Sequence, residues 1–207
     1  MWIVIILFLF CVTIILSSLN VYLNVNSIIT RKVFHIIICL VSLYNSLLYE
    51  ENLKIFIVPC IFVFCVLFIK QYKIMPFIRR IEEKNGDVWL SVIILINSFF
   101  IYFNIIDSFV IYIYYLILGF GDGVSGISPL IFEKRLMIKN GKSINGCSLF
   151  FLFSFLILLL FNNLLYNIPV YKVIVLCFSS ALIEFLSNRL SDNLLIYLNI
   201  LFFYYFI

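Results

Sequence analysis

This chain consists mainly of long apolar runs separated by short polar segments, and such runs leave few folds open to it. Only 12% of its residues are charged, about half the share of a soluble domain, so a water-soluble globule is excluded. Backbone groups in lipid must bond internally, and no alternating strand pattern is present, so each run predicts a helix. We expect an all-α, polytopic transmembrane bundle with about seven to eight spanning helices. The candidate spans are Met1–Leu19, Val33–Tyr49, Leu53–Ile69, Val88–Ile106, Ser108–Phe120, Cys147–Leu165, Val170–Leu186 and Leu194–Ile207.

The basic residues predict the orientation of these spans. With eight crossings, twelve of the 14 lysines and arginines fall on one side, leaving only Lys54 and Lys172 on the other. The positive-inside rule places the basic side in the cytoplasm. A net charge of +4 is too small and too scattered to indicate nucleic-acid binding. We expect residues 1–207 to form one membrane domain, in which a leading helix and loop (1–29) precede the functional core (30–200).

Several charges stand where the helix dipole disfavours them, with bases at a predicted helix start or acids at an end. Arg31, Lys32 and His35 open the second span, and Arg31 and His35 share a face at i and i+4. Together with free N–H groups of a first helical turn they predict an anion site. The alternative for Arg31 and Lys32 is the ordinary basic flank of a membrane helix.

Two further segments on the same side carry candidate ligands. Gly121, Asp122 and Gly123 follow the predicted end of the fifth span, where a carboxylate is favourable if a divalent cation binds and glycines let backbone approach a ligand. The alternative is a plain turn. Lys142, Ser143 and Gly146 precede the sixth span and could hold phosphate oxygens.

The last candidates are acidic. Glu184 is an ionisable group in the last turn of the seventh span, which makes it a functional candidate. Asp192 and Asn193 open the eighth span, where an acid also serves as an N-cap. Bases, a predicted metal ligand and carboxylates at one interface match the needs of phosphoryl transfer. The residues alone therefore indicate phosphate chemistry on a lipid.

In order, the blocks R-K-x-x-H, G-D-G, K-S-x-x-G, E and D-N resemble the CTP-dependent lipid-alcohol kinases, a family that includes phytol and other prenol kinases, dolichol kinase and a diacylglycerol kinase. The G-D-G and D-N forms look most like phytol or prenol kinases. The chain departs from the family at Ser125, where alanine is usual, and at Pro129 and Leu130. The blocks correspond to Arg31, Lys32, His35, Gly121, Asp122, Gly123, Lys142, Ser143, Gly146, Glu184, Asp192 and Asn193.

The resemblance implies CTP-dependent phosphorylation of a phytol-, farnesol- or geranylgeraniol-type alcohol. Asp122 would hold Mg²⁺, Lys142 with Arg31 and Lys32 would bind the triphosphate, and His35 would orient it. Asp192 or Glu184 would position or deprotonate the alcohol, beside Asn193 as a positioning group. The partners would be the lipid alcohol, the nucleotide and the bilayer of the endoplasmic reticulum or a plastid-type membrane, with the active face cytoplasmic. Dolichol kinase, diacylglycerol kinase, and a transporter or membrane scaffold are the alternatives.

Overall fold

A computed structural model describes most of the chain after its first 25 residues. The predicted span Met1–Leu19 lies outside the described residues. The described ranges are 26–50, 52–72, 86–132, 138–139, 142–165, 168–187 and 192–206.

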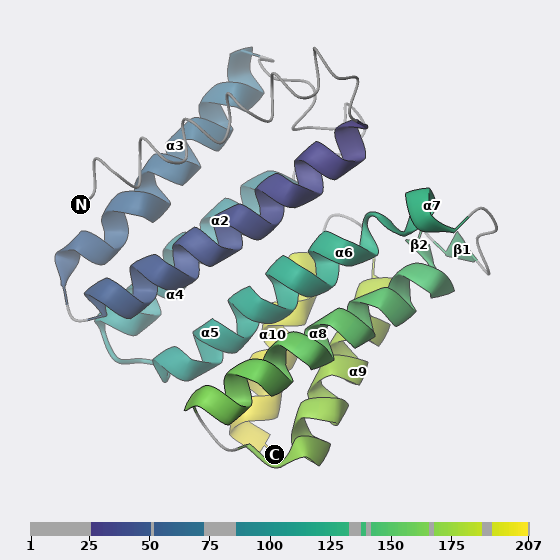
Figure 1. Ribbon diagram of the computed structural model, residues 1–207. Coiled ribbons are helices and arrows are strands. Elements are labelled where there is room, and N and C mark those ends of the chain that lie inside the picture. Colours follow the sequence, from purple (N-terminus) through teal and green to yellow (C-terminus); the bar gives the residue numbers. More distant parts are fainter. Residues whose placement is uncertain are drawn as a thin grey trace.

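The described residues are almost entirely helical, as predicted, apart from a hairpin of two short strands at one end of the bundle (Figure 1). Strands β1 and β2 pair antiparallel just before α8 begins. The elements are α2 (Ser27–Tyr49), η1 (Leu53–Phe56), α3 (Ile57–Tyr72), α4 (Gly86–Tyr102), α5 (Ser108–Leu116), η2 (Ile117–Asp122), α6 (Gly123–Ser125), α7 (Ser128–Ile131), β1 (Ile138–Lys139), β2 (Lys142–Ser143), α8 (Ile144–Leu165), α9 (Val170–Leu186) and α10 (Asp192–Phe206).

Three described helices are long and apolar enough to cross a membrane, and they cover Ile28–Tyr49, Ser108–Ile131 and Ile144–Asn162. Helices α3, α4 and α10 are apolar but shorter. The described part of the chain thus supports a helical bundle with three membrane-length helices. The described residues do not confirm the seven or eight crossings that the apolar runs predict.

Among the predicted boundaries that differ from the structure, two lie beside candidate site residues. Helix α2 begins at Ser27, not Val33, because the Asn26 side chain accepts a hydrogen bond from the Ile28 N–H at 2.9 Å and caps the helix there. The span that starts at Ser108 does not end at Phe120. It continues through Asp122 to Ile131, with the Gly126 N–H donating to the Asp122 carbonyl at 3.2 Å.

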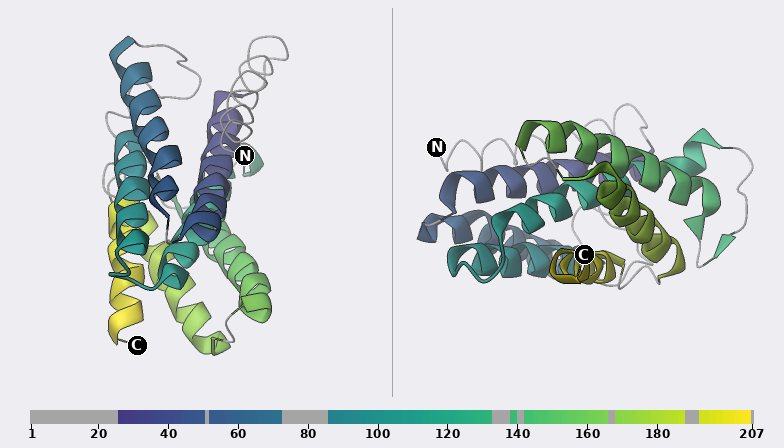
Figure 2. Two further views of the ribbon diagram at one scale, coloured as in Figure 1. Left: turned by 90° about the vertical axis from the view of Figure 1, so that its left-hand side faces the viewer. Right: turned by 90° about the horizontal axis from the view of Figure 1, so that it is seen from below.

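This continuous helix, Ser108–Ile131, is the central helix of the bundle. In the most apolar stretch of this helix 72% of the residues are buried, whereas the corresponding shares are 33% in α2 and 22% in α8. A helix that is apolar all round belongs in a protein interior, and Ile111, Tyr114 and Ile117 are fully buried. Helices α2, α8 and α10 contact it, and Figure 2 shows it between α2 and α8 on one side and α4 and α10 on the other.

Glycines allow the neighbouring helices to approach the central helix closely. A Cβ at Gly123 would lie 2.5 Å from Cγ1 of Ile36 in α2, and one at Gly119 would lie 2.9 Å from Cβ of Cys39. The spacing of four residues puts both glycines on the face toward α2, as in small-xxx-small packing in membranes. Gly121 faces α8 instead, where a Cβ would lie 2.4 Å from Oγ of Ser154. Gly121 and Gly123 thus face helices, not open space.

The close contact between Gly123 and Ile36 predicts that the effect of Gly123→Ala on stability changes sign when Ile36 is made smaller. Gly123→Ala should lower the thermal stability of the detergent-purified protein, because overpacking costs about 1–3 kcal/mol and outweighs the roughly 1 kcal/mol that alanine gains in a helix. In an Ile36→Ala background the same substitution should raise stability, because the added methyl group fills the vacated space. Equal effects in the two backgrounds would show that these helices do not meet there.

Candidate functional site

The first part of the site is a buried ion pair between α2 and the central helix. Lys32 Nζ donates to Oδ1 of Asp122 at 2.7 Å, and the two side chains are only 11% and 15% exposed. The Lys32 side chain lies over Gly126, where a Cβ would be 1.9 Å from its Cε. A side chain at position 126 would therefore displace the lysine from Asp122.

His35 lies on the other carboxylate oxygen, with Nε2 at 3.3 Å from Oδ2 of Asp122. The charges of Asp122, Lys32 and Arg31 all act on the imidazole. Among the described residues, Nε2 has no hydrogen-bond partner although it is buried. An orphaned buried polar atom costs free energy, and here it faces a carboxylate at the bundle end.

A π-helical segment places the Asp122 carboxylate at this position. Residues Ile117–Asp122 form η2, and Asp122 is its last residue. Single π-helical turns within α-helices are rare and occur frequently at functional sites. The prediction that Asp122 follows a helix C-terminus is therefore wrong, because the helix continues past it. The carboxylate is stabilised by Lys32, with His35 beside it, and no helix end opposes it.

The second part of the site is centred on Lys142, which joins the end of α9 to the start of α10. Its Nζ lies 3.2 Å from Oε1 of Glu184 and 3.0 Å from Oδ2 of Asp192. The same ammonium donates to the Glu184 backbone carbonyl at 2.6 Å and to Oγ of Ser187 at 3.4 Å. Carbonyls in the last helical turn have no partner within the helix, and a positive charge there interacts favourably with the negative end of the helix dipole. Lys142 therefore stabilises the end of α9 and links it to Asp192 at the start of α10.

Electrostatics at Lys142 favour its charged form. Burial alone lowers the pKa of the ammonium, but the carboxylates of Glu184 and Asp192 outweigh burial and hold the pKa above its usual range. Lys142 therefore stays charged at neutral pH and neutralises the acid in the last turn of α9. In this structure that acid is compensated within the protein.

The two charge clusters lie at the same end of the bundle and within electrostatic range of each other. The first cluster contains Arg31, Lys32, His35 and Asp122, and the second Lys142, Glu184 and Asp192. The charge of Lys142 acts on Asp122, and the charge of Asp122 acts on Glu184 and Asp192. The structure thus brings the predicted charged residues together from four distant segments.

The remaining predicted residues stabilise helix ends. Ser143 Oγ accepts a hydrogen bond from the Gly146 N–H at 3.1 Å, which makes Ser143 the N-cap of α8. The Asn193 N–H donates to Oδ1 of Asp192 at 2.9 Å at the start of α10, and the Asn193 side chain is buried. Because α2 begins at Ser27, the free N–H groups of its first turn precede Arg31 and His35, so that part of the predicted anion site is wrong.

Sequence reasoning missed Ser154 of α8. It is fully buried beside Gly121, and its hydroxyl has no hydrogen-bond partner among the described residues. Its only signal in the sequence is a single hydroxyl in an otherwise apolar run from Leu149 to Leu160. Ser154 and His35 flank the Gly121–Asp122 segment from α8 and α2.

Within the described residues, no group of three His, Cys, Asp or Glu side chains could hold a metal ion. No protein-family model, curated protein or solved structure matches this chain. What the site can do must therefore follow from its own residues.

The Lys142 cluster predicts a large stability effect. Lys142→Met should lower the free energy of unfolding by about 3–5 kcal/mol, because it leaves two buried carboxylates without a cation. Lys54→Met is the matched control, since Lys54 is exposed in η1 and should change stability by less than about 0.5 kcal/mol. Chemical denaturation in detergent measures both. Equal losses in the two variants would contradict the cluster.

Proposed function

We propose that this protein is an integral membrane kinase that transfers the γ-phosphoryl group of CTP to an isoprenoid alcohol. One observation carries the proposal: the sequence blocks that resemble the lipid-alcohol kinases supply residues that pair with one another across the bundle. Lys32 pairs with Asp122, and Lys142 pairs with Glu184 and Asp192. Nothing in helix packing alone requires these blocks to meet.

The charges of the two clusters suit phosphate chemistry. Lys32 pairs with Asp122, and Lys142 is shared by Glu184 and Asp192. Phosphate oxygens compete for the same ammonium groups. A nucleotide at this end could therefore take Lys32 and Lys142 as partners, with Arg31 close by. His35 Nε2, which has no hydrogen-bond partner among the described residues, would supply a further orienting contact.

The donor set is compatible with Mg²⁺. Glu184 Oε1 and Asp192 Oδ2 both lie within 3.2 Å of one nitrogen, so two carboxylates converge on a point that holds a cation. Mg²⁺ usually takes one or two carboxylates and completes its octahedron with water and phosphate, so three protein ligands are not needed. Asp122 is the ligand that the family resemblance implies. The Lys142 ammonium fills the point where Glu184 and Asp192 meet, so either of these would become a second ligand only when Lys142 turns to a phosphate oxygen. Bound there, the ion would neutralise charge on the phosphates.

The reaction requires an alcohol oxygen to attack the γ-phosphorus while the bond to the β-phosphate oxygen breaks and CDP leaves. The hydroxyl proton would pass to a carboxylate, and we propose Glu184 or Asp192 for this role. Asn193 lies next to Asp192 and could position the hydroxyl. Ser143 and Gly146 contribute by fixing Lys142 at the start of α8.

The preference for CTP and for a prenol comes from the family resemblance. Dolichol kinase and CTP-dependent diacylglycerol kinase use the same phosphate chemistry and differ in the lipid. We propose a multi-pass protein of the endoplasmic reticulum or a plastid-type membrane, with the charged end facing the cytoplasm, where the nucleotide is available.

An assay with membranes containing the protein tests the proposal. With Mg²⁺ and γ-labelled CTP, label should pass to farnesol, geranylgeraniol or phytol in preference to dolichol or diacylglycerol. Asp122→Asn should lower kcat/KM by about 100-fold or more, because it removes a charge from the reacting centre.

Asp107→Asn is the matched control. Asp107 caps the opposite end of the same helix, and asparagine caps equally well, so this variant should retain full turnover. Thermal unfolding with and without Mg²⁺–CTP checks that each variant folds, since a ligand that binds the native state raises its stability. A folded wild-type protein that transfers no label and gains no stability from Mg²⁺–CTP would refute the kinase proposal.

A further inference from the structure

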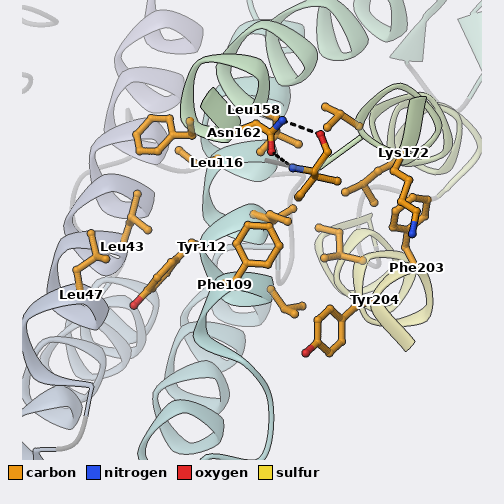
Figure 3. A pocket seen from close by; sticks show the side chains of 17 residues that line it. Leu43, Leu47, Phe109, Tyr112, Leu116, Leu158, Asn162, Lys172, Phe203 and Tyr204 are labelled. Carbon is orange, nitrogen blue, oxygen red and sulfur yellow. Dashed lines mark hydrogen bonds between the residues drawn. The ribbon is translucent and has the colours of Figure 1, made fainter. Parts of the chain in front are cut away.

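An apolar cavity of about 180 Å³ lies in the bundle (Figure 3), and no residue of the two charge clusters lines it. Its walls come from α2, α5, α8, α9 and α10, with Leu43, Leu116 and Leu158 among the lining residues. Asn162 is already paired, because its amide donates to the Ile168 carbonyl at 2.8 Å and accepts from the Ile168 N–H at 2.6 Å. Lys172 supplies the charge among the lining residues. The cavity therefore suits a hydrocarbon, not a polar molecule.

The helices that line the cavity also carry the charge clusters at their other ends. In four of them, a lining residue and a charged residue lie eight to eleven positions apart, a separation of about 12 to 17 Å along a helix. A hydrocarbon core is about 30 Å thick, so the cavity lies near the depth of the bilayer midplane if the charges mark one surface. The pairs are Leu43 and Lys32, Ile113 and Asp122, Val173 and Glu184, and Ile200 and Asp192.

We infer that this cavity receives the far end of the hydrocarbon chain of the lipid alcohol, whose hydroxyl lies at the charge clusters. This inference rests on the proposed kinase function. A cavity of about 150 Å³ holds a benzene ring, so this one has room for roughly six to eight carbon atoms. Each buried CH₂ group improves binding about fourfold. The protein therefore selects alcohols whose chains are long enough to reach the cavity.

Two valines of α9 provide a matched pair of variants. Val173 lines the cavity and is buried, whereas Val175 does not line it and is 47% exposed. For a series of prenols of increasing length, kcat/KM of the wild type should rise steeply once the chain reaches the cavity. Val173→Phe should remove that rise, with at least a tenfold loss for long alcohols and no change for short ones, while Val175→Phe should behave as wild type. Equal losses at every length would overturn the inference.

A second measurement is independent of turnover and of the folding of any variant. A prenol with a diazirine at its terminal carbon is photo-cross-linked to the wild-type protein, and the labelled peptides are identified by mass spectrometry. Label on the lining segments of α5 and α9, competed by unlabelled long prenol, supports the inference. Label elsewhere, or label that excess phospholipid competes away, overturns it.

The two proposals fail in different ways. If the protein transfers the phosphoryl group but the photo-label lies outside the cavity, the proposed chain site is wrong and the proposed kinase function stands. If the photo-label lies specifically in the cavity but no phosphoryl group is transferred, the cavity is a site for a prenyl chain and the proposed kinase function is wrong.

Discussion

The ion pair between Lys32 and Asp122 fixes α2 against the central helix at one depth. Removing two charges from water costs several kcal/mol for each ion, so such a pair persists only with close geometry and further partners. The 2.7 Å contact gives the close geometry, Gly126 leaves room for the lysine side chain, and the charge of Lys142 also acts on Asp122. The partners are 90 residues apart in the chain, and Gly119 and Gly123 bring their helices together so that they can meet.

Around this pair the bundle is divided along its length. Lys142 joins the C-terminal end of α9 to the N-terminal end of α10, and its charge acts on Asp122, so the two charge clusters lie at one end. The opposite half holds a cavity with mainly apolar walls. An amphiphile with a polar head and a long hydrocarbon chain matches this division, which is why a lipid alcohol fits the molecule better than a small polar solute.

Much of this arrangement could be predicted from the sequence. Apolar runs predict helices, and charges beside or within them mark Lys32, Asp122, Lys142 and Glu184 as residues that need partners. For Lys32 and Asp122 the predicted helix ends were wrong, although the residues themselves do pair. The course of the central helix could not be predicted, because Gly-Asp-Gly is typical of a turn in water, whereas in this bundle glycines allow helices to pack. The cavity and the position of Ser154 beside Gly121 could not be predicted either, because both depend on how one helix is rotated about its axis against another.

A double-mutant cycle at Lys32 and Asp122 tests the central claim most directly. Lys32→Gln, Asp122→Asn and the double variant are compared by chemical unfolding in detergent. If the two side chains pair in the buried end of the bundle, the effects are non-additive, with a coupling free energy of about 0.5–3 kcal/mol. Losses that simply add would show that the residues do not meet, and the account of the site would fail with them.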